Sequence, residues 1–388
     1  MHLGTINLNN RLRLLYGGQH YFPELIRAID QAREEIFLET YIFYPDESGA
    51  SVASALQRAS LRGVRVYVIT DWFGTGWRIC RALREELGGA GILFREFNPW
   101  FCRGLARQHR KIALVDKQVA FVGGINILDD FRYDMSSRQK QLDTPRWDFA
   151  VRVEGPLLNL IHDDVSAFWE RSGSMSFYER IKPYRLPRST RKRALMKTAL
   201  AGFITRDNLR NRRMIQRAYL RAMGRARHRI LLATPYFSPG RRFRNALIAA
   251  ANRGVEVTLL IGTGEFSWQD AVAKYFYPKL ISSGINVYEY RKTQLHAKVA
   301  VIDDVWATVG SSNCDGLSLF INHEANIVVL DHTFAASLGT YILRGVAEAV
   351  LVRIQDFAHL RWHHRLFHRV AHMVYRFIMR TVTWGDYN

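Results

Sequence analysis

Hydrophobic and polar residues alternate between two kinds of segment along this chain of 388 residues. Short apolar runs rich in β-branched and aromatic residues, such as 36–43 and 230–237, are typical of strands. Segments with helical character follow them at 53–61 and 245–251, and each ends near a glycine that precedes another apolar run. Strands that alternate with helices in this way predict an α/β fold.

The same order of segments occurs twice, which predicts two similar lobes. We expect each lobe to contain a mixed, mostly parallel sheet flanked by helices. The predicted divisions are a first lobe at 1–172, a basic linker at 173–210, a second lobe at 211–335 and a basic amphipathic tail at 336–388. Within the linker, residues 180–197 contain eight Lys or Arg and no Asp or Glu, which favours an exposed connection.

The charge balance favours a polyanionic partner. The 55 Lys and Arg against 35 Asp and Glu give a net charge of +20, which suits nucleic acid or an acidic lipid surface. The hydrophobic share of 48% excludes a disordered chain. The first residues lack the basic and apolar regions of a signal peptide, and no apolar run reaches the roughly 18 residues of a spanning helix. Any contact with a membrane is therefore expected to be peripheral.

One motif occurs twice at the same spacing and dominates the chemistry of the sequence. In each copy a His is followed by a Lys two positions later, then by Asp, Gly and Asn at matching intervals. The copies consist of His109, Lys111, Asp116, Gly123 and Asn126, and of His296, Lys298, Asp303, Gly310 and Asn313. Because alternate residues of a strand share a face, the His and Lys of each copy should project together. A single His-x-Lys would carry little weight, whereas the matched pair predicts two halves of one phosphate-handling site.

Two histidines and two lysines suit the transfer of a phosphodiester without a metal. One neutral imidazole attacks phosphorus to form a phosphohistidine, and the other, protonated, gives its proton to the departing alcohol. We assign His109 as the nucleophile and His296 as the general acid, although the near-symmetry of the motifs leaves the reverse assignment open. The non-bridging oxygens need cations and hydrogen-bond donors. The candidates are Lys111, Lys298, Asn126, Asn313 and Ser311.

Carboxylates complete the predicted site. A catalytic histidine needs a carboxylate to fix its tautomer, and Asp148 and Glu324 are the candidates because each follows its motif and precedes an apolar strand. Asp116 and Asp303 complete the catalytic motif set, but their place in the turns favours turn formation or a structural ion pair. The motifs offer too few carboxylates beside the histidines for a metal site, so neither a metal nor another cofactor is predicted.

The paired motifs, written HxK(x)4D(x)6G(G/S)xN, resemble those of the phospholipase D superfamily. The segments 295–298, 310–318 and 322–326, with 147–149 in the first half, are similar to bacterial cardiolipin synthases, and most similar to the short B type, which lacks an amino-terminal membrane hairpin. The resemblance implies a two-lobed pseudo-dimer with the active site between the lobes. It also implies phosphatidyl transfer from one phosphatidylglycerol to another with release of glycerol. The segment 314–318 lacks the Arg that precedes the corresponding Ser in the long-form enzymes. This departure leaves the donor and acceptor headgroups open.

On a helical wheel, residues 360–380 separate into an apolar side and a cationic side. The apolar side consists of Trp362, Leu366, Phe367, Val370, Met373, Val374, Phe377 and Ile378. The other side consists of Arg361, Arg365, His368, Arg369, His372, Arg376 and Arg380. This pattern is typical of an interfacial helix on anionic lipid, and the alternative is an ordinary amphipathic helix packed on the lobes. We expect a peripheral protein on the cytoplasmic side of the inner membrane, with a phosphatidylglycerol-containing surface as its partner.

Three functions fit these features. The favoured one is a phosphatidyltransferase that makes cardiolipin. A hydrolase or nuclease of the same superfamily would use the same motifs, but the amphipathic tail makes nucleic acid the less favoured partner. A non-catalytic membrane adaptor would keep the fold, and the presence of every motif residue argues against it.

Overall fold

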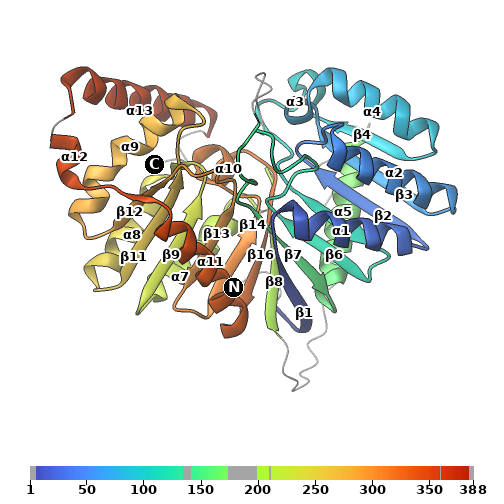
Figure 1. Cartoon of the computed structure of the whole chain (residues 1–388), viewed down its shortest axis with the longest axis horizontal. Coiled ribbons are helices and arrows are strands. Elements are labelled where there is room, and N and C mark those ends of the chain that lie inside the picture. The colour runs from blue at the N-terminus through green and yellow to red at the C-terminus, as the bar shows by residue number, and fades with distance from the viewer. Residues whose placement is uncertain (1–5, 134–140, 174–198, 209–210, 359, 384–388) are drawn as a thin grey trace.

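The computed structural model of the chain describes residues 6–133, 141–173, 199–208, 211–358 and 360–383, and it contains two lobes (Figure 1). The first lobe consists of β1 (Ile6–Tyr16), α1 (Gly17–Gln31), β2 (Glu35–Thr40), α2 (Glu47–Leu61), β3 (Arg65–Asp71), α3 (Trp72–Thr75), α4 (Trp77–Gly89), β4 (Leu93–Phe97), η1 (Pro99–Phe101), β5 (Ile112–Val115), β6 (Val119–Gly123), β7 (Phe149–Glu154) and α5 (Leu157–Ser172).

The second lobe repeats this order and adds a tail. It consists of β8 (Ala199–Arg206), α7 (Met214–Arg225), β9 (Arg229–Thr234), β10 (Phe237–Ser238), α8 (Arg241–Asn252), β11 (Glu256–Gly262), α9 (Ser267–Ser282), β12 (Asn286–Tyr290), β13 (Lys298–Ile302), β14 (Trp306–Gly310), β15 (Cys314–Asp315), α10 (Gly316–Phe320), β16 (Glu324–Leu330) and α11 (His332–Ala347). The tail contains β17 (Val350–Leu351), α12 (Ile354–Ala358) and α13 (Trp362–Val382).

The sheets of the two lobes join into one 15-stranded sheet, in the order β17-β12-β11-β9-β13-β14-β16-β8-β1-β7-β6-β5-β2-β3-β4. From the central β8–β1 pair outward, the two halves contain equivalent strands in the same order, apart from the extra edge strand β17, which confirms the predicted duplication. Parallel pairing is less extensive than predicted and lies in the outer strands β2, β3 and β4, and β9, β11 and β12. The inner strands are antiparallel because each motif folds into a hairpin, β5–β6 or β13–β14.

Strand β8 corrects the predicted domain boundaries. Its residues were assigned to the basic linker, but they pair antiparallel with β16 and β1 at the centre of the molecule. The reason is its apolar sequence, ALAGFITR, from which Ala201 and Phe203 are buried. The other linker residues at 174–198 and 209–210 lie outside the described part of the chain.

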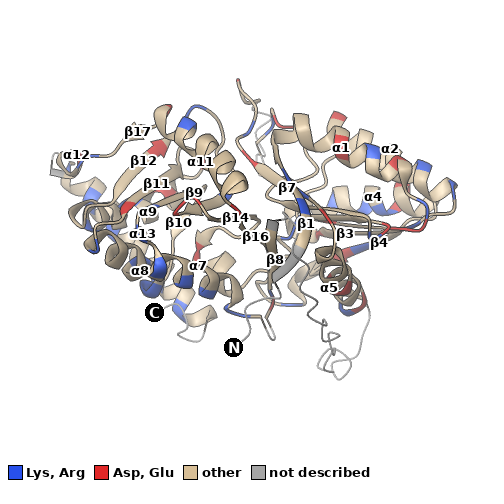
Figure 2. Cartoon of the chain, turned by 90° about the horizontal axis from the view of Figure 1, so that it is seen from below, with Lys and Arg blue, Asp and Glu red and all other residues tan. Residues whose placement is uncertain are grey.

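Helices cover both faces of each lobe (Figure 2). In the first lobe α1, α2 and α4 pack around one core cluster, while α5 contributes to the cluster on the other face. In the second lobe α7, α8 and α9 contribute to one cluster and α11 to the other. Helix α11 is thus the equivalent of α5, and the second lobe extends beyond the predicted limit at residue 335.

The predicted amphipathic helix of the tail is α13, which packs on α9. A narrow face that includes Ala371, His372 and Met379 is buried. All eight residues of the predicted apolar side are exposed, with Trp362 at 75% and Phe377 at 69%. The helix packs on the second lobe, as the alternative predicted, but it does so through this narrow face, and its apolar side faces outward. Across the described ranges, every helix is too short or too polar to pass through a bilayer.

Candidate active site

The two motif histidines lie at equivalent places, just before β5 and just before β13. His109 is 8% exposed and His296 is 5% exposed. Lys111 donates from Nζ to the carbonyl of His109 over 2.7 Å, and Lys298 makes the same bond to the carbonyl of His296. Each lysine thus lies beside the histidine of its own motif, as the strand spacing predicted.

Each histidine is held by a carboxylate from the opposite lobe. His109 Nδ1 lies 3.0 Å from Oε2 of Glu324, and His296 Nδ1 lies 2.5 Å from Oδ2 of Asp148. Both carboxylates are fully buried at the starts of the central strands β16 and β7. A carboxylate on Nδ1 fixes the proton there and leaves Nε2 of each ring for chemistry. The sequence identified both carboxylates as histidine partners, but it did not reveal that the pairs cross between lobes.

Backbone hydrogen bonds hold the same junction together. The amide of His109 donates to the carbonyl of His323 over 2.9 Å, and the amide of His323 donates to the carbonyl of Arg107 over 2.8 Å. Across the second contact, the amides of His296 and Ala297 both donate to the carbonyl of Trp147 over 3.0 Å. The backbone that carries each histidine is therefore fixed by the lobe that supplies its carboxylate.

The pKa values of the site depend on burial and on these cross-lobe charges. Burial lowers the pKa of His109 to about 4, although the charge of Glu324 opposes this effect. The cations of Lys111 and of Lys298, in the other lobe, lower it further. Burial alone would raise the pKa of each carboxyl, but the adjacent histidine and lysines outweigh it and hold both below their usual values. At neutral pH the site therefore holds two carboxylates and a neutral His109.

Asp116 and Asp303 lie at the far ends of the motif hairpins. The carboxylate of Asp116 accepts the amides of residues 33–35, with distances of 2.7 to 2.9 Å. Asp303 accepts the amides of residues 227–229 in the same way. Both adopt positive φ, 50° and 52°, in turns where the next residue also has positive φ. Their contacts support the structural role, and the structure does not bring them to the histidines with which the motif groups them.

The predicted phosphate donors differ in their surroundings. The hydroxyl of Ser311 donates to Oε2 of Glu324 over 2.5 Å, so its single proton serves the carboxylate rather than a phosphate. Asn126 is fully buried and its Oδ1 accepts the amide of Ile42. Asn313 is 6% exposed, and its Oδ1 has no hydrogen-bond partner among the described residues. Because Oδ1 is an acceptor, only Nδ2 of Asn313 could donate to a phosphate oxygen.

Tyr41 also lies in the site, although the sequence analysis did not predict it as a site residue. Its ring contacts that of His109, with centroids 4.9 Å apart, and Nζ of Lys111 lies 5.1 Å from the Tyr41 ring centre. Tyr41 follows strand β2 directly, next to the strand that carries the motif. A polar aromatic residue at the end of a strand in one half was a signal that sequence inspection could have used.

The chain is similar to known proteins over most of its length. A family described as the phospholipase D-like domain of cardiolipin synthase matches residues 25–130 and 219–344, one segment in each lobe. Cardiolipin synthase B of Salmonella typhi is 38% identical over 337 residues, which cover 85% of this chain and 78% of that protein. The protein of the same name from Escherichia coli K12 is 35% identical over the same shares. The crystal structure of phosphatidylserine synthase from Haemophilus influenzae superposes with a TM-score of 0.68 over 97% of both chains at 13% identity, which shows a shared fold. The chain therefore belongs to the cardiolipin synthase family of enzymes with paired phospholipase D-like domains.

Proposed function

We propose that the protein makes cardiolipin by transferring the phosphatidyl group of one phosphatidylglycerol to a second one, with release of glycerol. The observation that carries this proposal is the crossed pairing of His109 with Glu324 and of His296 with Asp148. It supplies two oriented imidazoles whose Nε2 atoms are left for chemistry, as a two-step displacement at phosphorus requires. The names of the related cardiolipin synthases support the same substrate class.

In the first step Nε2 of His109 attacks phosphorus and forms a P–N bond. The P–O bond to the glycerol headgroup breaks, and Nε2–H of His296 gives its proton to the departing oxygen. In the second step the hydroxyl of another phosphatidylglycerol gives its proton to His296 and attacks the same phosphorus. The P–N bond then breaks and His109 returns to its neutral state. Lys111 and Lys298 offset the charge on the non-bridging oxygens in both steps.

The assignment of His109 as the nucleophile rests on its protonation state. Its lowered pKa keeps the ring neutral at physiological pH, and only a neutral imidazole has a lone pair on Nε2. Glu324, held ionised, stabilises the positive charge that the ring gains when the P–N bond forms. His296 then takes the role of general acid.

We also propose that the enzyme works at an anionic membrane surface, on the cytoplasmic face of the inner membrane. Two exposed apolar regions support this: the outer side of α13, and the aromatic residues Phe73, Trp77, Trp100 and Phe101 around α3 and η1. Helices α13 and α3 lie along the same edge of the molecule, at the top of Figure 1. Met379 of α13 packs with Ala106 and Ile321, each three residues before His109 and Glu324 respectively. The exposed apolar edge is thus connected to the active site.

The test is lipid mass spectrometry after incubation of the purified protein with phosphatidylglycerol vesicles, beside a His109→Ala variant. We expect cardiolipin and free glycerol with the first protein and neither with the second. Phosphatidic acid without cardiolipin would replace the proposal with a hydrolase, in which water takes the phosphatidyl group. Full cardiolipin formation by His109→Ala would overturn the mechanism.

A further inference from the structure

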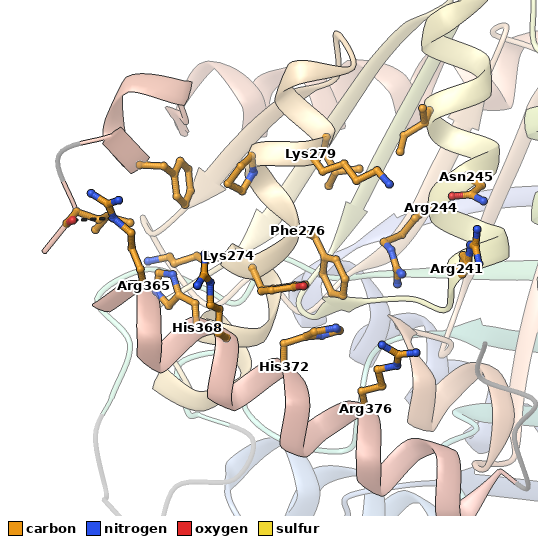
Figure 3. A pocket seen from close by; sticks show the side chains of 17 residues that line it. Arg241, Arg244, Asn245, Lys274, Phe276, Lys279, Arg365, His368, His372 and Arg376 are labelled. Atoms are coloured by element: carbon orange, nitrogen blue, oxygen red, sulfur yellow. Dashed lines mark hydrogen bonds between the residues drawn. The ribbon is translucent and has the colours of Figure 1, made fainter. Parts of the chain in front are cut away.

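A cationic cavity lies outside the paired motifs, between α8, α9 and α13 (Figure 3). Its volume is about 650 Å³, and no residue of either motif lines it. Its cations come from three helices: Arg241 and Arg244 from α8, Lys274 and Lys279 from α9, and Arg365, Arg369 and Arg376 from α13. Among the described residues that line it there is no Asp or Glu. We call this the α8–α13 cavity.

Part of the positive charge of the α8–α13 cavity is not balanced by a carboxylate among the described residues. Lys274 lies 3.5 Å from Glu289, which stands outside the cavity. Within the described part of the chain, no carboxylate forms an ion pair with Arg241, Arg369 or Arg376. Like charges held together at this density repel one another, and a bound anion would remove the repulsion.

His372 supplies an independent indication that a ligand belongs there. Its ring is 7% exposed, stacks on Tyr275 with centroids 4.0 Å apart, and stands edge-on to Phe276. Its Nδ1 has no hydrogen-bond partner among the described residues, although buried polar atoms are normally paired. Figure 3 shows the ring between the side chains of Phe276 and Arg376, inside the cavity. Nδ1 of His372 lies beside the cations of the cavity and, when protonated, can donate a hydrogen bond to an oxyanion.

We propose that the α8–α13 cavity is a second, non-catalytic site that binds the phosphate of an anionic phospholipid headgroup. Arg369 and Arg376 would contact the phosphate from the exposed rim, and His372 would donate to it from within. The proposal depends on the membrane association proposed above and not on cardiolipin synthesis.

The surroundings of the cavity favour a lipid over a nucleic acid. One wall is α13, whose exposed apolar side lies across the helix from the buried face. Trp268 at the start of α9 extends that apolar side, because its ring contacts Phe367 of α13 at 6.2 Å between centroids. When such a helix lies in a bilayer interface, the cations at its flank are at the level of the phosphates. A nucleic acid would gain nothing from the adjacent apolar surface.

The test compares two pairs of substitutions with the same change in charge on the same helix. Arg369→Gln with Arg376→Gln removes cations that line the cavity. Arg361→Gln with Arg380→Gln removes one exposed cation just before α13 and one within it, and neither lines the cavity. All four side chains are exposed, so both proteins should fold, and their thermal unfolding is compared first. Each pair is built on His109→Ala, which prevents turnover in the active site.

Two measurements follow with each protein. Calorimetric titration with monomeric dioctanoyl phosphatidylglycerol should give two sites per chain in the parent and in the Arg361/Arg380 pair, and one site in the Arg369/Arg376 pair. Flotation with vesicles of phosphatidylglycerol in phosphatidylcholine should show binding about tenfold weaker for the Arg369/Arg376 pair than for its control.

Other results would overturn the proposal in distinguishable ways. Equal losses in the two pairs would mean diffuse attraction without a site. A second site for inorganic phosphate but not for the lipid would mean a soluble ligand, and discrimination between the pairs by single-stranded DNA alone would mean nucleic acid. If the wild-type protein formed no cardiolipin but the titration still gave two sites, the proposed synthase function would fail and this inference would remain.

Discussion

Nδ1 of His296 lies 2.5 Å from Oδ2 of Asp148, although the two residues belong to different lobes. The reciprocal contact joins His109 to Glu324, so neither motif histidine is paired with a carboxylate of its own lobe. Backbone bonds from His296 and Ala297 to Trp147 close the same junction. The two lobes therefore depend on each other for the orientation of both catalytic rings, and a change at the junction should affect both steps of the reaction.

Substitution of either crossed carboxylate should nearly abolish cardiolipin formation. In Asp148→Asn or Glu324→Gln the fold can be kept, but the amide no longer fixes the histidine tautomer or stabilises a charged ring. We expect initial rates to fall by up to about 10⁴-fold, the loss found when the carboxylate of a catalytic triad is replaced by its amide. The rates would be measured by mass spectrometry with phosphatidylglycerol vesicles.

A matched control for these carboxylates is Glu348→Gln. Glu348 is an exposed partner of Lys292 in the second lobe, and its loss should leave the rate within about twofold because surface ion pairs contribute little. A rate above one tenth of wild type in Asp148→Asn would contradict the role given to the crossed pair.

Gly124 should be required for activity because a side chain at this position would collide with Asp148, and not because of its backbone conformation. A Cβ built at Gly124 would overlap the carboxylate of Asp148, so Gly124→Ala must displace the group that holds His296. We expect its rate to fall at least tenfold, with a smaller loss in thermal stability. Gly88→Ala is the control, because a Cβ at Gly88 in α4 meets nothing within 4 Å. Equal rates in the two variants would show that Asp148 is not constrained from this side.

Asp116 should matter for stability more than for catalysis. Its carboxylate accepts three backbone amides at the start of β2, and charge-assisted bonds of this kind contribute about 1–3 kcal/mol in all. Asp116→Asn keeps a residue that tolerates positive φ but loses the charge, so we expect a lower unfolding temperature and a rate within a few-fold of wild type. Unfolding would be followed by circular dichroism beside the lipid assay. A rate that fell as far as in Asp148→Asn would indicate a catalytic role instead.

The sequence predicted the residues of the site better than their arrangement. The matched motifs identified both histidines, both lysines and the hairpins that carry them, because a duplicated spacing is visible without a structure. The crossing of Asp148 and Glu324 was not visible, since it depends on β8 and β1 joining the two sheets. The apolar sequence of β8 was obscured by the basic residues around it. Ser311 was assigned to phosphate because its type fits, whereas its neighbour Glu324 takes its only proton.

The acid limb of the pH–rate profile should lie well below the usual range of histidine. The folded pKa of His109 is lowered to about 4, and its ordinary value is 6.5, so the nucleophile stays neutral until the pH approaches 4. We therefore expect kcat/KM to be nearly constant from pH 7 down to about 5 and to fall below that. The stability of the fold should also decrease as the pH falls from about 6.5 to about 4. In this range His109 of the unfolded chain binds a proton that His109 of the folded site does not. A half-loss of kcat/KM near 6.5, without unfolding, would contradict the assignment of His109.

The exposed side of α13 leads to a prediction about membrane binding that is separate from catalysis. Trp362 and Phe377 are among its most exposed apolar side chains, and they make limited contact with the protein. Replacement of both by Ser should therefore leave the folded protein intact while removing apolar area that a bilayer would bury. Full burial of one such side chain contributes about 1.5–3 kcal/mol, and each 1.4 kcal/mol is tenfold in affinity. Partial burial of the pair should thus weaken flotation with phosphatidylglycerol vesicles at least tenfold.

The matched control for the tail pair is Leu61→Ser with Val350→Ser, two residues that are 83% and 63% exposed elsewhere on the molecule. This control should float as the wild type does. The rate on vesicles should fall with binding in the α13 variant, whereas the rate on dispersed short-chain phosphatidylglycerol should not, because the variant leaves both histidines and their carboxylates in place. Loss on both substrates would place α13 in the support of the active site, to which Met379 connects it, rather than at the membrane.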